Sequence, residues 1–162
     1  MCMYSCQDGV ANDFHFTHYT SRAQGGVGLI IFEATGVHPK GRISNGCMGI
    51  WNDEQATALK RINDYIHQTS ATKTGIQLAH AGRKASTKDN VQISLEEGWE
   101  TVAPSPIPYQ DGERIPHVLS IEEIKDLVDR SKTDGFKVIK INPDLSDLVL
   151  VYYPDNRLNE LI

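Results

Sequence analysis

The chain has 162 residues, a formal net charge of −5, 40% hydrophobic and 23% charged residues, a composition typical of one globular domain or part of a larger one. It has no apolar run long enough to span a membrane and no basic block interleaved with aromatic residues, so neither a membrane nor a nucleic acid is an expected partner. Three cysteines, an odd number, and a start without the basic and apolar regions of a secretory signal predict free thiols in a cytoplasmic protein.

The first eleven residues hold two of the cysteines, Cys2 and Cys6. Their spacing of four is unusual for zinc, and no matching Cys/His pair follows, so no metal site is expected. From composition alone, Cys2 is interpreted as a small buried hydrophobe.

A first helix is predicted over residues 13–24, capped by Asn12 or Asp13 and ended by Gly25 and Gly26. His15 and His18 share this helix with no acidic residue placed to form a dyad. They are interpreted as amphipathic or surface histidines.

The continuous apolar run 27–32 predicts a strand covered on both faces, which is typical of parallel sheets. It leads into the small and polar residues 33–36. Asn52 and Gln55 resemble a capping box that opens a second helix over 53–70, whose buried stripe is expected to be Leu59, Ile62 and Ile66.

The stretch 74–84 is the most informative part of the chain. A short apolar strand runs into four side chains that can hydrogen-bond or carry charge, namely Gln77, His80, Arg83 and Lys84. In α/β proteins, polar groups at the end of a buried strand mark the ligand-binding rim. A strand that simply enters a basic surface loop is the alternative, and local features do not separate the two.

A loop of more than thirty residues, about 85–119, is predicted to be a lid or rim excursion because ordinary connections are much shorter. Ser120 and Glu123 form a capping box for a third helix over 121–133, expected to face inward through Ile124, Leu127 and Val128. A strand at 136–141 completes an alternation of helices and strands that demands a mostly parallel sheet. The β-prone run 148–153 is not assigned a place.

With these elements placed, the chain resembles the old yellow enzyme family, the FMN-dependent NAD(P)H:flavin oxidoreductases, and within it the bacterial NADPH dehydrogenase branch. Several short motifs occur in the family order, together covering about residues 1–141. They are Met1–Ser5, His18-Tyr19 to Ala23, Val27–Ile31, Glu33-Ala34, Gly41–Ile43, Gly49–Trp51 and Gly75–Ala85.

The resemblance implies an α/β fold that is part of a TIM (β/α)8 barrel, roughly its first four βα units with the first strand truncated. Residues 1–141 are then the N-terminal part of an FMN-binding barrel, and residues 142–162 are a divergent tail. A whole barrel takes about 250 residues.

The resemblance also assigns roles to individual residues. Cys2 would lie against the flavin and tune its potential, and Tyr4 would reach the substrate. The backbone of Ala34 would face the isoalloxazine edge, while the amide of Gln77 would pair with the pyrimidine edge. The family motif places His80, together with Arg83, at the mouth as a substrate-binding residue.

The implied reaction transfers hydride from NADPH or NADH to FMN and then to an activated alkene or a quinone, whose oxygen is held by hydrogen-bond donors. Family members place two histidines and a tyrosine after the strand that ends at Ile141. This chain has Asn142, Leu145 and Asp147 there.

Two hypotheses follow from that departure. The chain is either an FMN oxidoreductase, or a non-catalytic truncated fragment of one that cannot hold FMN or reduce substrate alone. An open half-barrel also leaves strand edges unpaired, which predicts marginal stability and self-association.

Overall fold

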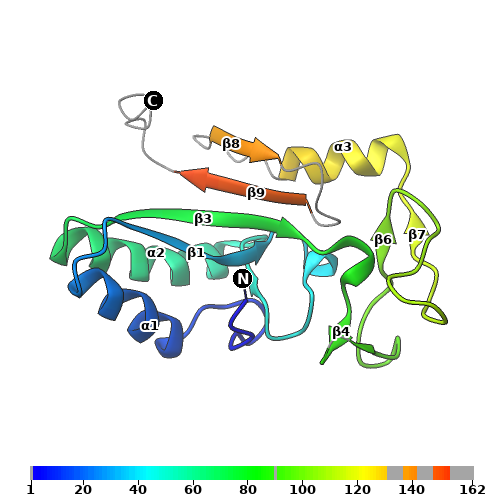
Figure 1. The fold of residues 1–162 in the computed structure, drawn as a ribbon, viewed down its shortest axis with the longest axis horizontal. Coiled ribbons are helices and arrows are strands. Elements are labelled where there is room, and N and C mark those ends of the chain that lie inside the picture. The colour runs from blue at the N-terminus through cyan, green and yellow to red at the C-terminus, as the bar shows by residue number, and fades with distance from the viewer. Residues whose placement is uncertain (1, 90, 131–136, 142–147, 154–162) are drawn as a thin grey trace.

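The computed structural model describes residues 2–89, 91–130, 137–141 and 148–153. Its centre is a five-stranded sheet with the strand order β2-β1-β3-β9-β8. Strands β1 (Leu29–Gly36) and β3 (Lys73–His80) pair in parallel, and β2 (Met48–Gly49) extends the sheet in parallel on the other side of β1. Figure 1 shows helices α1 and α2 together on one face of β1 and β3.

Side-chain caps begin the three helices where the sequence predicts them. The Asn12 side chain accepts the N–H of Phe14, the Asn52 side chain accepts that of Gln55, and Ser120 and Glu123 bond each other reciprocally. These bonds satisfy N–H groups that a first helical turn leaves without partners. The helices are α1 (Asp13–Gln24), α2 (Asp53–Thr69) and α3 (Ile121–Arg130). The predicted residues 131–133 lie outside the described part of the chain.

The core lies between the sheet and the two helices that cover it. The predicted stripe of α2, Leu59, Ile62 and Ile66, is buried. From the sheet, alternate residues of β1 point into the same layer, and the ring of Phe32 meets that of Tyr19 on α1 edge-on at 4.7 Å. The pattern of burial therefore confirms the predicted helix–sheet packing.

The C-terminal strands depart from the expected arrangement. Strand β8 (Lys137–Ile141) runs in the same direction as β3 but is not its neighbour, because β9 (Leu148–Tyr153) lies between them, antiparallel to both. Only six residues separate β8 from β9. That length suits an antiparallel return and is too short for a parallel crossover. The predicted third parallel strand exists, but the sheet is mixed at this edge.

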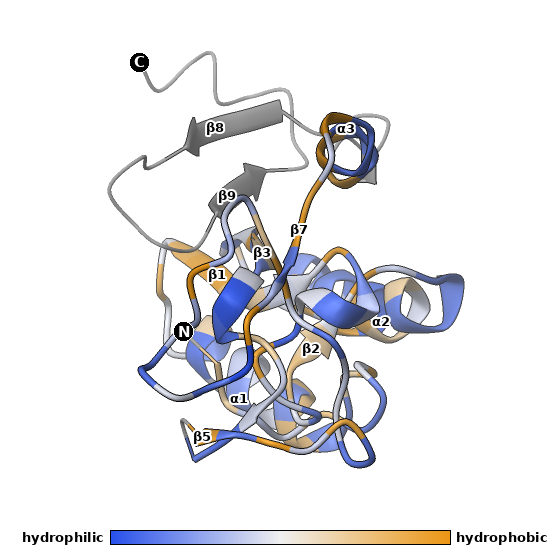
Figure 2. Ribbon diagram, turned by 90° about the vertical axis from the view of Figure 1, so that its right-hand side faces the viewer, coloured by the Kyte–Doolittle hydropathy of each residue, from blue (hydrophilic) through white to orange (hydrophobic). Residues whose placement is uncertain are grey.

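Helix α3 corrects a second expectation. The residues predicted to face inward are Ile124, Leu127 and Val128, yet Ile124 and Val128 are 40% and 38% exposed, and Leu127 is only partly buried. Figure 2 shows the reason, since α3 lies apart from the layer that α1 and α2 form against β1 and β3. The apolar stripe of α3 is present, but no core lies under it among the described residues.

The long excursion between β3 and α3 is more organised than its composition predicts. It carries four two-residue strands. Arg114, late in the excursion, donates to the carbonyl oxygens of Trp99 and Ile93 in its earlier part, and these bonds hold the two parts together. The strands are β4 (Thr87–Lys88), β5 (Val91–Gln92), β6 (Val102–Ala103) and β7 (His117–Val118). Among the described residues, no helix is long and apolar enough to cross a membrane.

We expect the isolated chain to self-associate through the sheet face opposite α1 and α2. Leu29 and Ile31 on that face are 51% and 47% exposed, and apolar side chains on a strand are a ready surface for association. Size-exclusion chromatography should show oligomers for the natural chain, and a Leu29→Thr/Ile31→Thr variant should elute closer to the monomer.

The matched control is Val91→Thr/Leu95→Thr, which removes two apolar side chains from the excursion instead, and these are even more exposed, at 64% and 60%. This control should elute like the natural chain. A natural chain that elutes as a cooperatively folded monomer would contradict the prediction.

Candidate functional site

A cavity of about 430 Å³ opens where β1 and β3 end. Because the two strands are parallel, their carboxyl ends meet at one edge of the sheet. Ala34 and Gly36 line the cavity from β1, and Gln77, Ala79 and His80 line it from β3. The remaining lining residues come from three loops and are Cys2, Tyr4, Gly41, Arg42, Ile43, Cys47, Ala81 and Lys84.

The sequence-predicted residues therefore come together, with one exception. Cys2, Tyr4, Ala34, Gln77 and His80 all line the cavity. Arg83 does not. Its guanidinium donates to the Ile107 carbonyl and to the Ser105 hydroxyl, both at 3.0 Å, so it supports the excursion that follows β3.

The N-terminal segment reaches the cavity with one residue in an unfavourable backbone conformation. Tyr4 has a positive φ of 53°, a conformation that costs energy for a residue with a side chain. Gly46 packs directly against it, and a Cβ at Gly46 would lie 2.5 Å from the Tyr4 carbonyl oxygen. The Cys6 N–H donates to the Gly46 carbonyl at 2.9 Å, which fixes this close approach.

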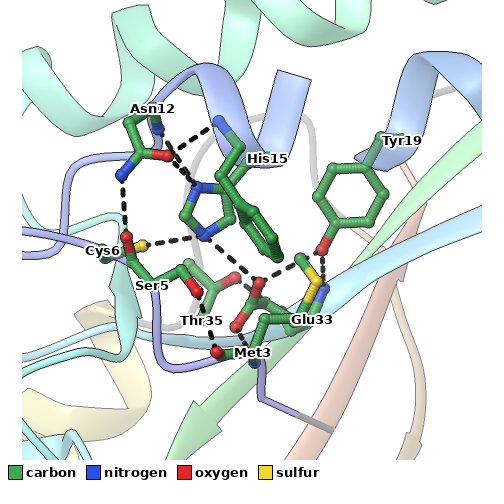
Figure 3. A network of polar contacts seen from close by, with 9 residues as sticks. Met3, Ser5, Cys6, Asn12, His15, Tyr19, Glu33 and Thr35 are labelled. Atoms are coloured by element: carbon green, nitrogen blue, oxygen red, sulfur yellow. Dashed lines mark hydrogen bonds and ion pairs between the residues drawn. The ribbon is translucent and has the colours of Figure 1, made fainter. Parts of the chain in front are cut away.

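A buried polar network beneath the cavity anchors the same segment (Figure 3). The Glu33 carboxylate accepts the Met3 N–H at 2.7 Å and the Tyr19 hydroxyl at 3.4 Å, and the Tyr19 oxygen in turn accepts the Glu33 N–H. Glu33 thus ties the N-terminal segment, β1 and α1 together. It stands next to Ala34, so the network sets the position of the cavity wall.

His15 belongs to this network, so of the two interpretations, an amphipathic or a surface histidine, the surface one is wrong. It is fully buried, and its Nε2 lies 3.6 Å from Glu33 Oε1 and 3.3 Å from Cys6 Sγ. Its Nδ1 accepts the N–H of Asn12, the residue that caps α1. The same Nδ1 also lies 3.0 Å from Asn12 Oδ1, so Asn12 holds this edge of the ring while Nε2 faces Glu33 and Cys6. The capping-box position, three residues after Asn12, was the signal in the sequence.

Burial sets the protonation of this network. It raises the pKa of Glu33, although the bond from the Met3 N–H acts in the opposite direction, and it lowers the pKa of His15. Both shifts favour the neutral forms. His15 Nε2 and Glu33 Oε1, 3.6 Å apart, are therefore in contact without the pKa shifts that a strong buried ion pair would produce.

Arg42 and Cys47 are lining residues that the sequence reasoning did not select. The Arg42 guanidinium lies between two indole rings, 5.1 Å from the Trp51 centroid and 5.0 Å from that of Trp99. These rings hold a cation at the cavity wall. Lys84 adds a second charge from the end of the 3-10 turn η2 (Gly82–Lys84).

His80 presents an unsatisfied donor at the site. Its Nδ1 accepts the Gly82 N–H at 3.1 Å, so the neutral ring carries its proton on Nε2. Among the described residues, that buried Nε2 has no hydrogen-bond partner. Burial, with a smaller contribution from His38, lowers the pKa of His80 to about 4. The ring is therefore a neutral hydrogen-bond donor near neutral pH.

Comparison with known proteins shows which family the chain belongs to. The model of the NADH:flavin oxidoreductase / NADH oxidase family matches residues 1–135. The chain belongs to this family. An NADPH dehydrogenase of Listeria monocytogenes serotype 4a (strain HCC23) is 50% identical over 88% of the chain, and one of Bacillus pumilus (strain SAFR-032) is 44% identical over the same share. The chain spans 41% of the length of each.

Two solved structures agree with this chain in fold. Morphinone reductase matches with a TM-score of 0.64 at 25% identity, over 80% of this chain and 37% of its own. The old yellow enzyme homologue from Zymomonas mobilis matches with a TM-score of 0.62 at 29% identity, over 80% and 36%. One morphinone reductase structure is a complex with tetrahydroNAD. The family positions of Asn142, Leu145 and Asp147 lie outside the described residues of this chain.

The depressed pKa of His80 predicts how acid destabilises this chain. Above the unfolded pKa of about 6.5, the imidazole is neutral in both states and contributes no pH dependence. As the pH falls from 6.5 towards 4, His80 becomes protonated in the unfolded chain, whereas the buried ring of the native chain stays mostly neutral. Native stability should therefore fall by up to about 3 kcal/mol from this group.

Urea unfolding of the natural chain and a His80→Gln variant at several pH values checks this prediction. Between pH 6.5 and 4 the variant should lose less stability than the natural chain, because the titrating group is gone. Val91→Gln, at an exposed position without a titratable side chain, should keep the natural slope. Equal slopes for the natural chain and His80→Gln would contradict the prediction.

Proposed function

We propose that this chain provides the ring-binding wall of an FMN-dependent NADPH oxidoreductase of the old yellow enzyme type. The observation that carries the proposal is the single cavity at the carboxyl ends of β1 and β3, which gathers Cys2, Ala34 and Gln77 from three separate segments. Barrel enzymes of this class place their sites at that end of the strands. We also propose that residues 1–141 correspond to about the first four βα units of a TIM barrel, with the first strand truncated.

The lining suits a flat aromatic ring. Ala34, Gly36 and Gly41 present little side-chain bulk, so a planar ligand can approach the backbone of β1 closely. The Gln77 amide supplies both a donor and an acceptor, which matches the alternating edge of the flavin pyrimidine. The volume of about 430 Å³ lies within the usual range for small-molecule sites. Cys2 contributes a polarisable sulfur at the same wall.

The bound flavin would supply the hydride transfer between a nicotinamide and an activated alkene or quinone. The chain's own groups would bind and orient the substrate. Burial raises the pKa of Tyr4, so its half-exposed hydroxyl stays protonated and can donate to a substrate oxygen. The Nε2–H of His80 is a second donor of this kind. Arg42 and Lys84 add positive charge that favours an anionic substrate or cofactor.

The alternative, that this chain alone neither holds FMN nor reduces substrate, is favoured by the pairing of β9. In a parallel barrel the next strand would occupy the free edge of β3, and here β9 occupies it in antiparallel register. Barrels place the phosphate site after their seventh and eighth strands. A phosphate contributes charge-assisted hydrogen bonds, whereas each neutral bond to the ring nets only about 1 kcal/mol.

We therefore expect the purified chain to be colourless and to show no NADPH-dependent alkene reduction. A version in which residues 1–141 are joined to the remaining part of the Listeria monocytogenes relative should be yellow and active. Titration of FMN, followed by flavin fluorescence, measures binding in both. An Ala34→Leu substitution in the joined version should abolish the yellow colour, because the added side chain would fill the space for the ring.

Val91→Leu in the joined version is the matched control, since it adds bulk at an exposed position away from the cavity. It should leave FMN binding unchanged. Stoichiometric fluorescence quenching of micromolar FMN by the chain alone would refute the fragment alternative. A joined version that folds but binds no FMN would refute the proposed function itself.

A further inference from the structure

The cavity contains two thiols that come from distant parts of the sequence. Cys2 lies in the N-terminal segment, and Cys47 precedes β2. Both line the cavity, both are free, and a hydrogen bond joins the two side chains. The structure therefore holds a close dithiol, defined here as Cys2 and Cys47.

The surroundings of Cys47 favour its thiolate. Its sulfur accepts the Ser44 N–H at 3.4 Å and contacts the Ser44 hydroxyl at 3.8 Å. The Arg42 guanidinium lines the same cavity and interacts electrostatically with it. The hydrogen bond from Cys2, followed by those from Ser44 and against the effect of burial, lowers the pKa of Cys47 to about 6.

The third cysteine is a contrasting case within the same chain. Cys6 is also buried, but it does not line the cavity and its sulfur faces His15 Nε2 at 3.3 Å. Burial, with a smaller contribution from Glu33, raises the pKa of Cys6 to about 12. Reactive cysteines occupy electropositive and accessible surroundings, whereas structural ones do not. Cys47 and Cys6 are both buried, at 3% and 7% exposure, and they differ in that Cys47 borders the cavity and interacts with the Arg42 guanidinium.

We propose that Cys2 and Cys47 form a hydroperoxide-reactive dithiol, in which Cys47 is the attacking thiol and Cys2 the resolving one. The Cys47 thiolate attacks the terminal peroxide oxygen. The S–O bond forms, the O–O bond breaks, and the leaving alkoxide or hydroxide takes up a proton. Cys2 then attacks the Cys47 sulfenic acid, the S–S bond forms, and the hydroxyl leaves as water with the Cys2 proton.

The atoms and electrons of this reaction balance with the two thiols and the hydroperoxide alone. Two thiols and one hydroperoxide give one disulfide, one alcohol or water from the peroxide, and one further water, and the two electrons pass from sulfur to the peroxide. A soft metal ion is a less suitable occupant of the dithiol, since no cluster of three or more ligating side chains exists among the described residues. The reaction does not require bound FMN.

Peptide mapping tests the proposal on the chain as it stands. After treatment with one equivalent of hydrogen peroxide near neutral pH, blocking of free thiols and digestion with trypsin, residues 1–22 should be found linked to residues 43–60. Peptide 1–22 contains both Cys2 and Cys6, so the link must persist in Cys6→Ala. It must be absent in Cys47→Ala. In Cys2→Ala, a sulfenic-acid reagent should label Cys47.

Alkylation rates test the same assignment by an independent readout. At neutral pH, Cys47 is mostly thiolate and Cys6 is almost entirely thiol. The Cys47 thiolate is intrinsically the weaker nucleophile because its pKa is lower, but this effect is smaller than the difference in thiolate fraction. Iodoacetamide should therefore modify Cys47 about a hundredfold faster than Cys6. In concentrated guanidinium chloride that ratio should collapse to about one. This second measurement shows that the folded cavity, rather than the sequence around Cys47, causes the difference.

Three results would overturn the proposal. They are a link that disappears in Cys6→Ala, a Cys47 that proceeds to the sulfinic acid without forming a link in the natural chain, and equal alkylation of Cys47 and Cys6 in the folded chain. None of them bears on FMN binding, so the dithiol and the proposed function fail or succeed separately.

Discussion

The structure depends on how one buried carboxylate is satisfied. Glu33 lies near the carboxyl end of β1, where burial makes an unpaired charge costly. Its partners come from two other segments, the Met3 N–H and the Tyr19 hydroxyl, with His15 alongside. Meeting this requirement places the N-terminal segment across the end of the sheet. Cys2 and Tyr4 reach the cavity because the backbone between them is held by Glu33.

The cavity itself follows from parallel pairing, and its limits follow from where that pairing stops. The parallel alignment of β1 with β3 brings Ala34 and Gln77 to the same edge of the sheet. At the other edge of β3, antiparallel β9 ends the parallel run. The edge of parallel strands that forms the cavity therefore extends from β3 towards β1, and it stops at the side of β3 that pairs with β9.

The sequence predicted those features whose causes are local. Asn12, Asn52 and Ser120 cap helices because their side chains bond N–H groups two or three residues away. The positions of Gln77 and His80 at a strand end were also predicted from local sequence, because a short apolar run leads directly into these polar side chains. His15 and Cys47 were not, because their roles depend on partners distant in sequence, Glu33 and Cys2. The place of β9 was also unpredictable from its composition, since a β-prone run is compatible with either edge and either direction.

Cys2 links the two proposed properties of the cavity, and its geometry makes them compete. A sulfur that lies against a flavin ring and a sulfur bonded to Cys47 at about 2.0 Å cannot occupy one position, since a disulfide fixes both Cβ atoms within about 4 Å of each other. A ring bound against Ala34 and Gln77 would also cover the approach of a peroxide to the thiol pair, because all four residues line one cavity. Occupancy of the ring site should therefore protect the dithiol, and the disulfide should remove a flavin contact. For the equilibrium between dithiol and disulfide, linkage requires that flavin binding and disulfide formation disfavour each other to the same extent.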